Sequence, residues 1–393
     1  MLFADMLKKI TPYVLMLCAL MAYLPIKYGD IPMYVATVLF LHALYKRQIT
    51  FPDDVKGYFL AFGVWAGAML VCSFTSCDAV SSFKAWLNWF VWRPLPCLLM
   101  LCAALTIKWN KAVLSSLTLM FMVIAVAIIY KGFVTGQRAG GIFTTSPMIE
   151  AGYMMLFIPL SLITFYDERI FGKYRLVAGV LSGVASVAML FNQTRGTWIA
   201  VGVTAIVIVW RYWHWNKINK VFTLILLVIP LLVVVMKPSL LNRWTSDINH
   251  FNNIARVRIW TAAYNMWRDY PMFGIGFRQF APNYQKKYIL STATNSEKVL
   301  EHAHNSYMHM MAEGGTIGLF AFLLCFGYFL RQSWKDYKKY EDPYSFAIFC
   351  ITMSLMLRGL TEYDFAHTHV MKCYWMLMGG LLALHVQAKQ LKE

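Results

Sequence analysis

Long apolar runs separated by short polar segments organise most of this chain. The runs are about 16 to 20 residues long, which is roughly the length of helix that crosses a bilayer. A soluble domain would instead show amphipathic periods of apolar and polar positions. The pattern therefore predicts an all-α, polytopic membrane protein that forms one integral membrane domain, residues 1–393. The predicted spans lie near residues 12–28, 31–45, 57–75, 85–105, 112–130, 148–166, 175–191, 196–212, 221–236, 306–330, 344–358 and 372–386, which makes about twelve transmembrane helices.

Lysine and arginine residues gather on alternate loops between these spans, from Lys8 and Lys9 near the start to Lys389 near the end. Because positively charged loops stay in the cytoplasm, both termini are expected there. One loop on the opposite side is long, covering residues 237–305, and long loops cross the membrane whatever their charge. A large outer loop is therefore expected after the ninth span.

This outer loop carries a helical pattern of its own. Residues 251–270 place apolar and aromatic side chains at spacings of three and four, which predicts a helix that stops at Pro271. Gly274 and Gly276 predict a flexible turn, because glycine adopts backbone conformations that other residues avoid. Residues 277–288 are aromatic and basic, which predicts an amphipathic surface helix. The outer loop is thus expected to be partly helical.

The composition, with 59% hydrophobic and 14% charged residues, agrees with a membrane protein. The net charge of +17 is spread over many short loops, and no soluble domain exists to form a basic face, so no nucleic-acid partner is expected. The eight cysteines include no CxxC pair, which argues against a thiolate metal site. Cys72 and Cys77 flank one outer boundary, where two free thiols are favoured over a disulfide.

The predicted outer face is richer in arginine than the cytoplasmic face. Lysine is sufficient for membrane topology, whereas the planar guanidinium fork of arginine matches the oxygens of phosphate and carboxylate groups. This difference predicts a phosphorylated or otherwise anionic ligand at the outer face. The alternative is that these arginines only anchor the protein to lipid headgroups.

A dense polar cluster, residues 301–307, stands directly before the tenth span. Ionisable groups at a membrane boundary are costly and usually functional. His304 is the first catalytic candidate because imidazole titrates near neutral pH, with a purely structural role as the alternative. Asn305 is expected to orient the His304 ring or to hydrogen-bond a sugar hydroxyl. No ligand spacing such as HExxH supports a metal site, so none is expected. The histidines that such a site would draw on are His302, His304, His309, His367 and His369.

Several arginines are candidate substrate contacts. Arg256 and Arg258 project about 200° apart on the predicted helix, so only one of them can face a given site. Arg195 stands at the outer end of the eighth span, and Arg138 lies in a glycine-rich outer loop. The convergence of several arginines on one face would favour ligand binding over headgroup anchoring more strongly than any single arginine does.

Arg93 differs because it precedes Pro94 inside the fourth predicted span. At 1.5 Å per residue it would lie about 12 Å deep, where an arginine needs a partner or an aqueous cavity. Two alternatives are open. Arg93 pairs with Glu362 or Asp364 of the last outer loop, or it reaches a lipid phosphate.

Together these residues resemble the O-antigen ligase and O-antigen polymerase superfamily of bacterial inner-membrane glycosyltransferases. The resemblance is firmest over residues 130–330. It rests on Arg138-Ala-Gly-Gly-Ile-Phe, Thr194-Arg195-Gly196-Thr197-Trp198, Arg256-Val-Arg-Ile-Trp260, Pro271-Met-Phe-Gly274-Ile-Gly276, and His304-Asn305 followed by Gly315 and Gly318. The last spacing is the ligase pattern of His, then Asn, Ser or Gln, nine residues, Gly, two residues and Gly. Glycines at these positions would also let the tenth span pack closely on its neighbours.

The resemblance implies a ligase with twelve spans and one large periplasmic loop. Such an enzyme transfers O-antigen glycan from undecaprenyl pyrophosphate to a sugar hydroxyl of lipid A-core at the periplasmic face of the inner membrane, during lipopolysaccharide biosynthesis. It uses no ATP, metal or other cofactor, and its partners are these two lipid-linked substrates and the membrane lipids.

The resemblance also assigns roles to residues. His304, Arg195 and Arg256 become the catalytic candidates, with histidine acting on the acceptor hydroxyl and arginine on the departing pyrophosphate. Arg138 matches a further arginine position of the family. The substrate-binding candidates are Arg138, Asn305, Arg93 and Arg258.

Three alternatives to the ligase remain. An O-antigen polymerase uses the same donor but extends another lipid-linked glycan, and a protein O-oligosaccharyltransferase glycosylates a protein. A transporter of lipid-linked intermediates would need cationic residues inside many spans. Only Arg93 is expected to be clearly buried, which favours an enzyme.

Overall fold

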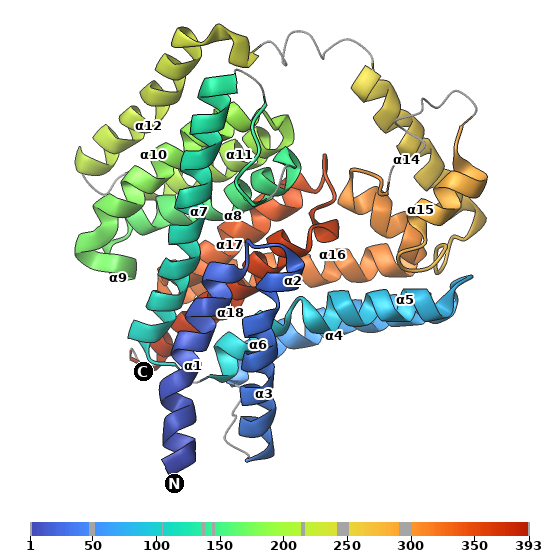
Figure 1. Ribbon diagram of the computed structural model, residues 1–393, viewed down its shortest axis with the longest axis horizontal. Helices are drawn as coiled ribbons and strands as arrows, with labels where there is room; N and C mark the ends of the chain where they lie inside the picture. The colour runs from blue at the N-terminus through green and yellow to red at the C-terminus, as the bar shows by residue number, and fades with distance from the viewer. Residues whose placement is uncertain are drawn as a thin grey trace.

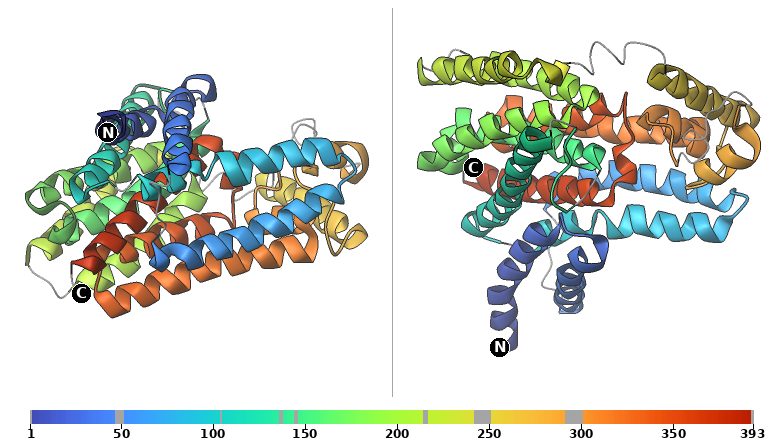
Figure 2. Two further views of the ribbon diagram at one scale, coloured as in Figure 1. Left: turned by 90° about the horizontal axis from the view of Figure 1, so that it is seen from below. Right: turned by 45° about the horizontal axis from the view of Figure 1, so that its top comes forward.

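The computed structural model describes residues 2–46, 52–103, 105–135, 138–143, 146–213, 217–241, 251–290 and 301–391. These residues form an all-helical protein, with no β-strand among them. Helices α4 (Lys56–Phe74) and α16 (Ser306–Tyr340) run side by side along the long axis (Figures 1 and 2). Helices α14 (Phe251–Asp269) and α15 (Phe280–Asn283) gather at one end, beside the start of α16.

Each predicted span coincides with a helical segment. The first six correspond to α1 (Leu2–Met21), α3 (Ile31–Tyr45), α4, the pair α5 (Ala79–Trp86) and α6 (Leu95–Cys102), α7 (Ile107–Thr135) and α8 (Pro147–Tyr166). The last six correspond to α10 (Arg175–Asn192), α11 (Arg195–Tyr212), α12 (Lys217–Met236), α16, α17 (Pro343–Arg358) and α18 (Thr368–Gln390). Two short helices, α2 (Ile26–Gly29) and α9 (Glu168–Phe171), lie between them.

Among the described residues, six helices are long and apolar enough to cross a membrane: Asp53–Phe74, Ile107–Thr135, Pro147–Tyr166, Arg175–Asn192, Lys217–Met236 and Ser306–Tyr340. Three shorter apolar helices, Lys9–Met21, Ile31–Tyr45 and Pro343–Arg358, accompany them. The most apolar part of α8 is 89% buried, whereas that of α12 is 6% buried. Helix α8 is therefore central, and α12 presents its apolar side chains outward, as the surface of a polytopic membrane protein does.

The fourth predicted span is not one continuous helix. Helix α5 runs into a π-helical turn, Leu87–Trp92, whose end is marked by a hydrogen bond of 2.9 Å from Arg93 N–H to the Asn88 carbonyl. Pro94 then separates this turn from α6, because proline has no N–H to donate and its ring displaces the preceding turn. Arg93 thus lies at a joint between helices and is only 5% exposed.

Helix α16 is longer than predicted and kinks at Gly315, whose φ of 61° only glycine adopts readily. The turn that follows Pro271 docks at this kink, with Gly276 N–H donating to the Glu313 carbonyl at 3.1 Å. Gly314 and Gly318 both face Met69 of α4, where an added Cβ would lie 2.9 Å from the sulfur atom. The predicted close packing of the tenth span is confirmed. The turn that carries Gly274 and Gly276 thus lies against the part of α16 that carries Gly315 and Gly318.

The described parts of the outer segment 237–305 are partly helical, as predicted, while residues 242–250 and 291–300 lie outside the described residues. Helix α14 ends at Asp269 before Pro271, and Gly274 and Gly276 take positive φ angles. The predicted surface helix over 277–288 is instead α15 followed by a π-helical turn. Apolar side chains of these elements form a second small core with the start of α16. Cys72 and Cys77 are free thiols, as expected.

Candidate active site

The loop between α17 and α18, residues 359–367, is held by a fully buried ion pair. Arg358 at the end of α17 pairs with Asp364, and both side chains are 0% exposed. Another guanidinium nitrogen of Arg358 donates to the Met148 carbonyl of α8 at 2.8 Å. Because a buried charge is costly without a partner, this pair fixes the 359–367 loop against α8.

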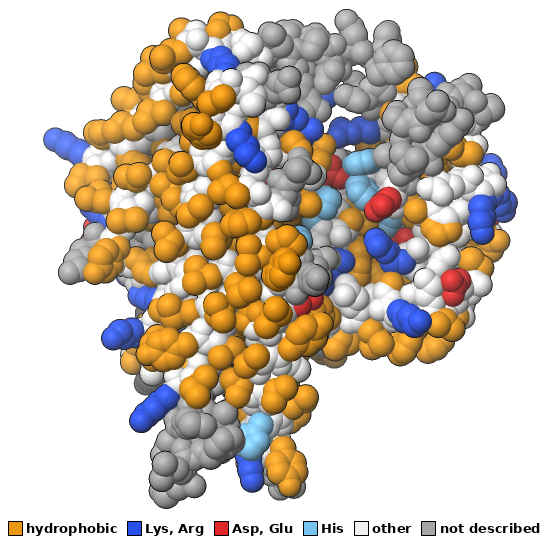
Figure 3. Space-filling view, viewed as in Figure 1, with side chains coloured by type: hydrophobic (Ala, Val, Ile, Leu, Met, Phe, Trp, Pro, Cys, Tyr) orange, Lys and Arg blue, Asp and Glu red, His pale blue; other side chains and the backbone are white. Residues whose placement is uncertain are grey.

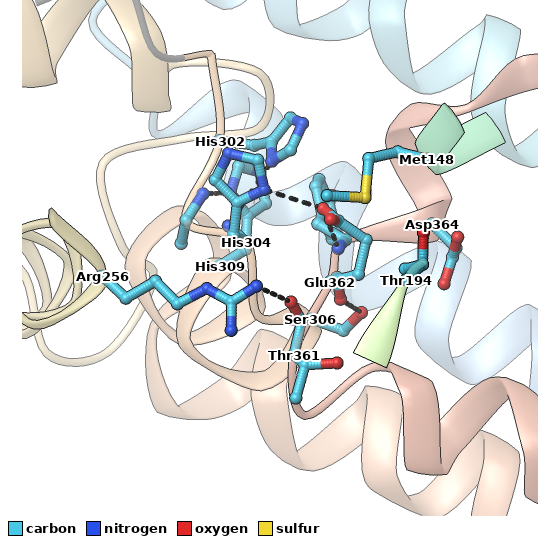
Figure 4. Close-up of polar contacts among 12 residues, drawn as sticks. Met148, Thr194, Arg256, His302, His304, Ser306, His309, Thr361, Glu362 and Asp364 are labelled. Atoms are coloured by element: carbon cyan, nitrogen blue, oxygen red, sulfur yellow. Dashed lines mark hydrogen bonds and ion pairs between the residues drawn. The ribbon is translucent and has the colours of Figure 1, made fainter. Parts of the chain in front are cut away.

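His304 lies against this loop (Figure 4). Its Nδ1 atom is 2.8 Å from Glu362 Oε1, and its side chain is 25% exposed whereas that of Glu362 is 3% exposed. The backbone of His304 has a φ of 48°, in the left-handed region that costs a non-glycine residue roughly 1–3 kcal/mol. On its C-terminal side, Ser306 N–H donates to the Gly359 carbonyl at 2.7 Å. The segment is thus tied to the loop at two points around His304.

Glu362 is the ionised partner in this contact. Burial alone would raise its pKa, but the hydrogen bond to His304 and the charges of the histidines and of Arg358 outweigh burial and lower the pKa. A carboxylate accepts a proton from Nδ1–H, which leaves Nε2 as the basic nitrogen of a neutral His304 ring. No partner of Nε2 is present among the described residues. His304 therefore has the geometry of an oriented general base.

Two further histidines stand beside His304 and stay neutral. The ring of His302 lies 4.3 Å from that of His304 and 6.1 Å from that of His367, measured between ring centroids. Burial lowers the pKa of His302 to about 3 and that of His367 to about 4. At neutral pH these rings therefore add polarity to the site without adding positive charge.

The predicted pool of metal-binding histidines does not come together as one cluster. His309 bonds Glu313 inside α16 at 3.3 Å, and His369 faces the Ala22 carbonyl at 3.2 Å. Donor atoms of His302, His304 and Glu362 do lie within 4.8 Å of one another, the only set of this kind in the described part of the chain. The expectation that the reaction needs no metal stays a prediction.

Asn305 caps a helix. Its side-chain oxygen accepts hydrogen bonds from the backbone N–H groups of Tyr307 and Met308, at 2.9 and 3.0 Å. Its amide nitrogen donates to the Leu360 carbonyl at 2.9 Å. Asn305 is therefore the N-cap of α16 and a tie to the 359–367 loop, and its predicted contact with a sugar hydroxyl stays a prediction.

Arg256 reaches the same loop from α14. Its Nη2 atom donates to the Thr361 carbonyl at 3.3 Å (Figure 4). Trp260, one helical turn further on, donates its indole N–H to the Ala303 carbonyl at 3.0 Å, directly before His304. Because residues four apart share a helix face, both contacts place this face of α14 toward the site, while Arg258 projects from another face.

Arg195 is the first residue of α11, whose N-terminus also approaches Thr361. A Cβ added at Gly196 would lie 1.9 Å from Thr361 Oγ1, so only glycine permits this approach. Arg195 is partly exposed, and its guanidinium has no hydrogen-bond or ion-pair partner among the described residues. The backbone beside Arg195 and the guanidinium of Arg256 therefore both approach Thr361, one residue from the Glu362 that holds His304.

Arg138 is already engaged by the protein. Its Nη2 atom donates to Thr194 Oγ1 at 2.9 Å, and its Nε atom donates to the Asn192 carbonyl at 3.1 Å. Asn192 in turn donates to the Pro147 carbonyl at 2.9 Å. These contacts position the backbone directly before Arg195.

Arg93 meets the 359–367 loop, but not through the predicted carboxylates. It donates to the Phe365 carbonyl and, at 3.1 Å, to the Asn88 side chain, and its guanidinium lies 4.3 Å from the Trp89 ring. Glu362 and Asp364 are instead taken by His304 and Arg358. The prediction of a carboxylate pair is therefore wrong.

The expectation that Arg93 alone is clearly buried is also wrong. Arg358 is 0% exposed and Lys372 of α18 is 2% exposed. These two pair with Asp364 and Asp30, so their charges are compensated within the protein. They therefore add no uncompensated positive charge along a transport path through the membrane. The argument that favoured an enzyme over a transporter is unchanged.

The site opens into a hollow on the face shown in Figure 3, where side chains of Lys, Arg, His, Asp and Glu gather beside a broad apolar surface. Sequence reasoning missed Arg358, and it named Glu362 only as a possible partner of Arg93. The signal for Glu362 was the polar run Thr361-Glu362-Tyr363-Asp364 between two apolar spans, which marks a polar loop but not its partners.

Residues 180–323 match the family model described as O-antigen ligase. No curated protein matches the chain. The matched region contains Arg195, Arg256 and His304, whereas the 359–367 loop lies beyond it. The three residues that the motifs singled out therefore lie within one matched region, and this region of the chain is similar to the O-antigen ligase family.

Proposed function

We propose that this protein is an O-antigen ligase. It transfers glycan from undecaprenyl pyrophosphate to a sugar hydroxyl of lipid A-core at the periplasmic face of the bacterial inner membrane. The observation that carries the proposal is the placement of His304, held by Glu362, next to Thr361, which is approached by the Arg256 guanidinium and by the backbone at the start of α11 beside Arg195.

In the proposed reaction, His304 Nε2 takes the proton of the acceptor hydroxyl as its oxygen attacks the anomeric carbon of the donor glycan. The carbon–oxygen bond to the pyrophosphate breaks, and the leaving group departs with the electron pair. Glu362 stabilises the imidazolium that forms, as a carboxylate does in a catalytic triad. General-base catalysis of this kind contributes about 10²- to 10⁴-fold.

Arg195 and Arg256 act on the departing pyrophosphate. Positive groups placed where negative charge develops are worth about 10²- to 10³-fold each, and more where water is excluded. Arg195 is available because no partner occupies it among the described residues, and Arg256 reaches the Thr361 carbonyl at 3.3 Å. Arg138 supports Arg195 through Thr194 and Asn192.

The membrane arrangement belongs to the same proposal. The segment 237–305 supplies α14, and the 359–367 loop lies near it, so both are assigned to the periplasmic side. Both termini are then cytoplasmic, and the residues 1–393 form one membrane domain.

The test uses purified full-length protein with lipid-linked O-antigen glycan and, in separate reactions, lipid A-core or a second lipid-linked glycan as acceptor. A ligase glycosylates lipid A-core, whereas a polymerase lengthens the lipid-linked glycan instead. Transfer is expected to persist in excess EDTA without ATP, because arginine supplies the positive charge that a metal ion gives other enzymes. Loss in EDTA that added Mg²⁺ or Zn²⁺ restores would contradict the arginine-based mechanism.

A further inference from the structure

A cavity of about 240 Å³ lies among the ends of several helices, away from the candidate active site. Its wall comes from the start of α7, from α9, from the junction between α16 and α17, and from the last turns of α18. Helix α16 begins at Ser306 beside His304 and ends at Tyr340 in the wall of the cavity. Its 35 residues separate the two regions by about 50 Å along the helix. The cavity is therefore distinct from the groups assigned to transfer.

Asp342 is the carboxylate in the wall of this cavity, and the protein already satisfies it. As the N-cap of α17, it accepts hydrogen bonds from the backbone N–H groups of Tyr344 and Ser345, at 3.2 and 2.9 Å. Its Oδ2 atom also lies 2.8 Å from His385 Nδ1. Because these groups surround the carboxylate and bury it, Asp342 does not serve as the counter-ion of a lysine in the cavity.

Three cations line the cavity, and their charges are balanced differently. Arg169 pairs with Asp167 at 2.6 Å, and Lys389 pairs with Asp54 at 2.6 Å. Lys111 has no carboxylate partner in the described part of the chain, and its Nζ atom donates to the Arg169 carbonyl at 3.3 Å. Since a carbonyl carries no net charge, the positive charge of Lys111 is left uncompensated at the wall of the cavity.

Most of the remaining wall is apolar. Ile107 lies one helical turn before Lys111 on the same face of α7, and Leu384 and Ala388 face the cavity from α18. Leu391, which follows α18, also lines the cavity and is 77% exposed, so the wall continues to the outer surface. A small soluble anion would leave this apolar wall in water, and a hydrocarbon chain alone would leave Lys111 unpaired. An occupant that satisfies both is an anionic group attached to an apolar chain.

We propose that this cavity binds the phosphate group of an anionic phospholipid, with Lys111 as the charged contact and the apolar wall against the start of an acyl chain. Helices α7, α16, α17 and α18 are predicted spans, and the ends of such helices lie at the level of the lipid headgroups. The pattern of lysine and arginine predicts that these ends are cytoplasmic, and basic pockets between membrane helices on that side hold anionic headgroups. The inference concerns a site beyond the transfer reaction and does not depend on it.

The test measures lipid binding by purified full-length protein in mixed micelles. Phosphatidylglycerol and phosphatidylcholine with the same acyl chains are compared by native mass spectrometry, and wild type is expected to bind phosphatidylglycerol more tightly. Lys111→Gln is expected to weaken phosphatidylglycerol binding about 5-fold or more, because it removes the unpaired charge. Lys108→Gln is the matched control, since it removes the same charge from an exposed position of α7 outside the cavity wall. It is expected to change the affinity less than about 2-fold.

A second variant fills the cavity and keeps its charges. Ala388→Phe is expected to weaken phosphatidylglycerol binding as much as Lys111→Gln does, with folding checked by size-exclusion chromatography, and it decides the question if Lys111→Gln does not fold. Wild-type affinity in Ala388→Phe would overturn the proposal. Equal binding of the two lipids by wild type, or equal losses in Lys108→Gln and Lys111→Gln, would also overturn it, because binding would then not depend on the unpaired charge in the cavity.

Inorganic phosphate is the third probe and separates a lipid from a soluble anion. The proposal expects phosphatidylglycerol to raise the Tm of wild type at concentrations where inorganic phosphate has no effect, because a ligand that binds the folded state stabilises it. If inorganic phosphate raises the Tm through Lys111 and phosphatidylglycerol does no better than phosphatidylcholine, the cavity is a site for a soluble anion and the lipid assignment is wrong.

Discussion

Two pairs of ionisable side chains are attached to the 359–367 loop, and they differ in how far water reaches them. Arg358 and Asp364 are both 0% exposed, whereas His304 is 25% exposed over a Glu362 that is 3% exposed. A pair sealed from solvent can exchange neither protons nor ligands, so it can only hold the chain. A pair open on one side can do chemistry there, provided that the sealed pair keeps the loop still.

The largest expected effect comes from disrupting the fully buried pair of Arg358 and Asp364. Arg358→Leu leaves Asp364 buried without a partner, which is expected to cost about 3–5 kcal/mol of stability. Most of the protein should then fail to accumulate in folded form, as measured by size-exclusion chromatography in detergent. Changing both partners, Arg358→Gln with Asp364→Asn, is expected to recover much of the folded yield. A folded, fully active Arg358→Leu protein would contradict the anchoring role.

The next largest effect concerns the arginines at Thr361. Arg195→Lys and Arg256→Lys are each expected to lower kcat about 10- to 100-fold, because a point charge does not reproduce the bidentate guanidinium fork. Arg258→Lys is the matched control on another face of α14 and should retain most activity. Equal losses at Arg256 and Arg258 in steady-state kinetics would defeat the assignment of one helix face to the site.

Glu362 gives a smaller effect, since it acts through His304. Glu362→Gln keeps an acceptor for the ring N–H but removes the negative charge. Because removal of such an orienting partner typically costs about 10-fold or more, kcat is expected to fall by that factor. The measurement is kcat with both substrates saturating. A Glu362→Gln protein that keeps the wild-type kcat would contradict the role of Glu362 in orienting His304.

A further prediction concerns stability in acid. Burial lowers the pKa values of His302 and His367 to about 3 and about 4, below the usual 6.5. The unfolded chain therefore binds more protons, so stability is full above pH 6.5 and falls as the pH drops below it. At pH 5 each of these histidines is expected to lower the free energy of unfolding by about 2 kcal/mol. His367→Gln should thus shrink the drop in Tm between pH 7 and pH 5, measured by tryptophan fluorescence, and an unchanged drop would contradict this.

The sequence was sufficient for the helices and for the main site residues because those depend on local pattern. Apolar runs predicted the positions of the spans, and motif spacing pointed to His304, Arg195 and Arg256, which the structure brings to one loop. The break at Arg93 was foreseeable from Pro94, since proline interrupts a helix wherever its missing N–H was needed.

The remaining features depend on contacts between distant parts of the chain. The contacts by which Asn305 caps α16 and reaches Leu360 follow only from the placement of the two segments. Arg358 reads as the end of a span until its partner Asp364 is placed.

The central claim is that His304 activates the acceptor hydroxyl, and single-turnover transfer by purified His304→Ala protein tests it most directly. The account predicts a rate about 10²- to 10⁴-fold below wild type, with the Tm and the affinity for the lipid-linked donor unchanged. His309→Ala, which removes a histidine bonded inside α16, serves as the comparison and should retain far more of the rate. Transfer by His304→Ala at more than half the wild-type rate would contradict the account.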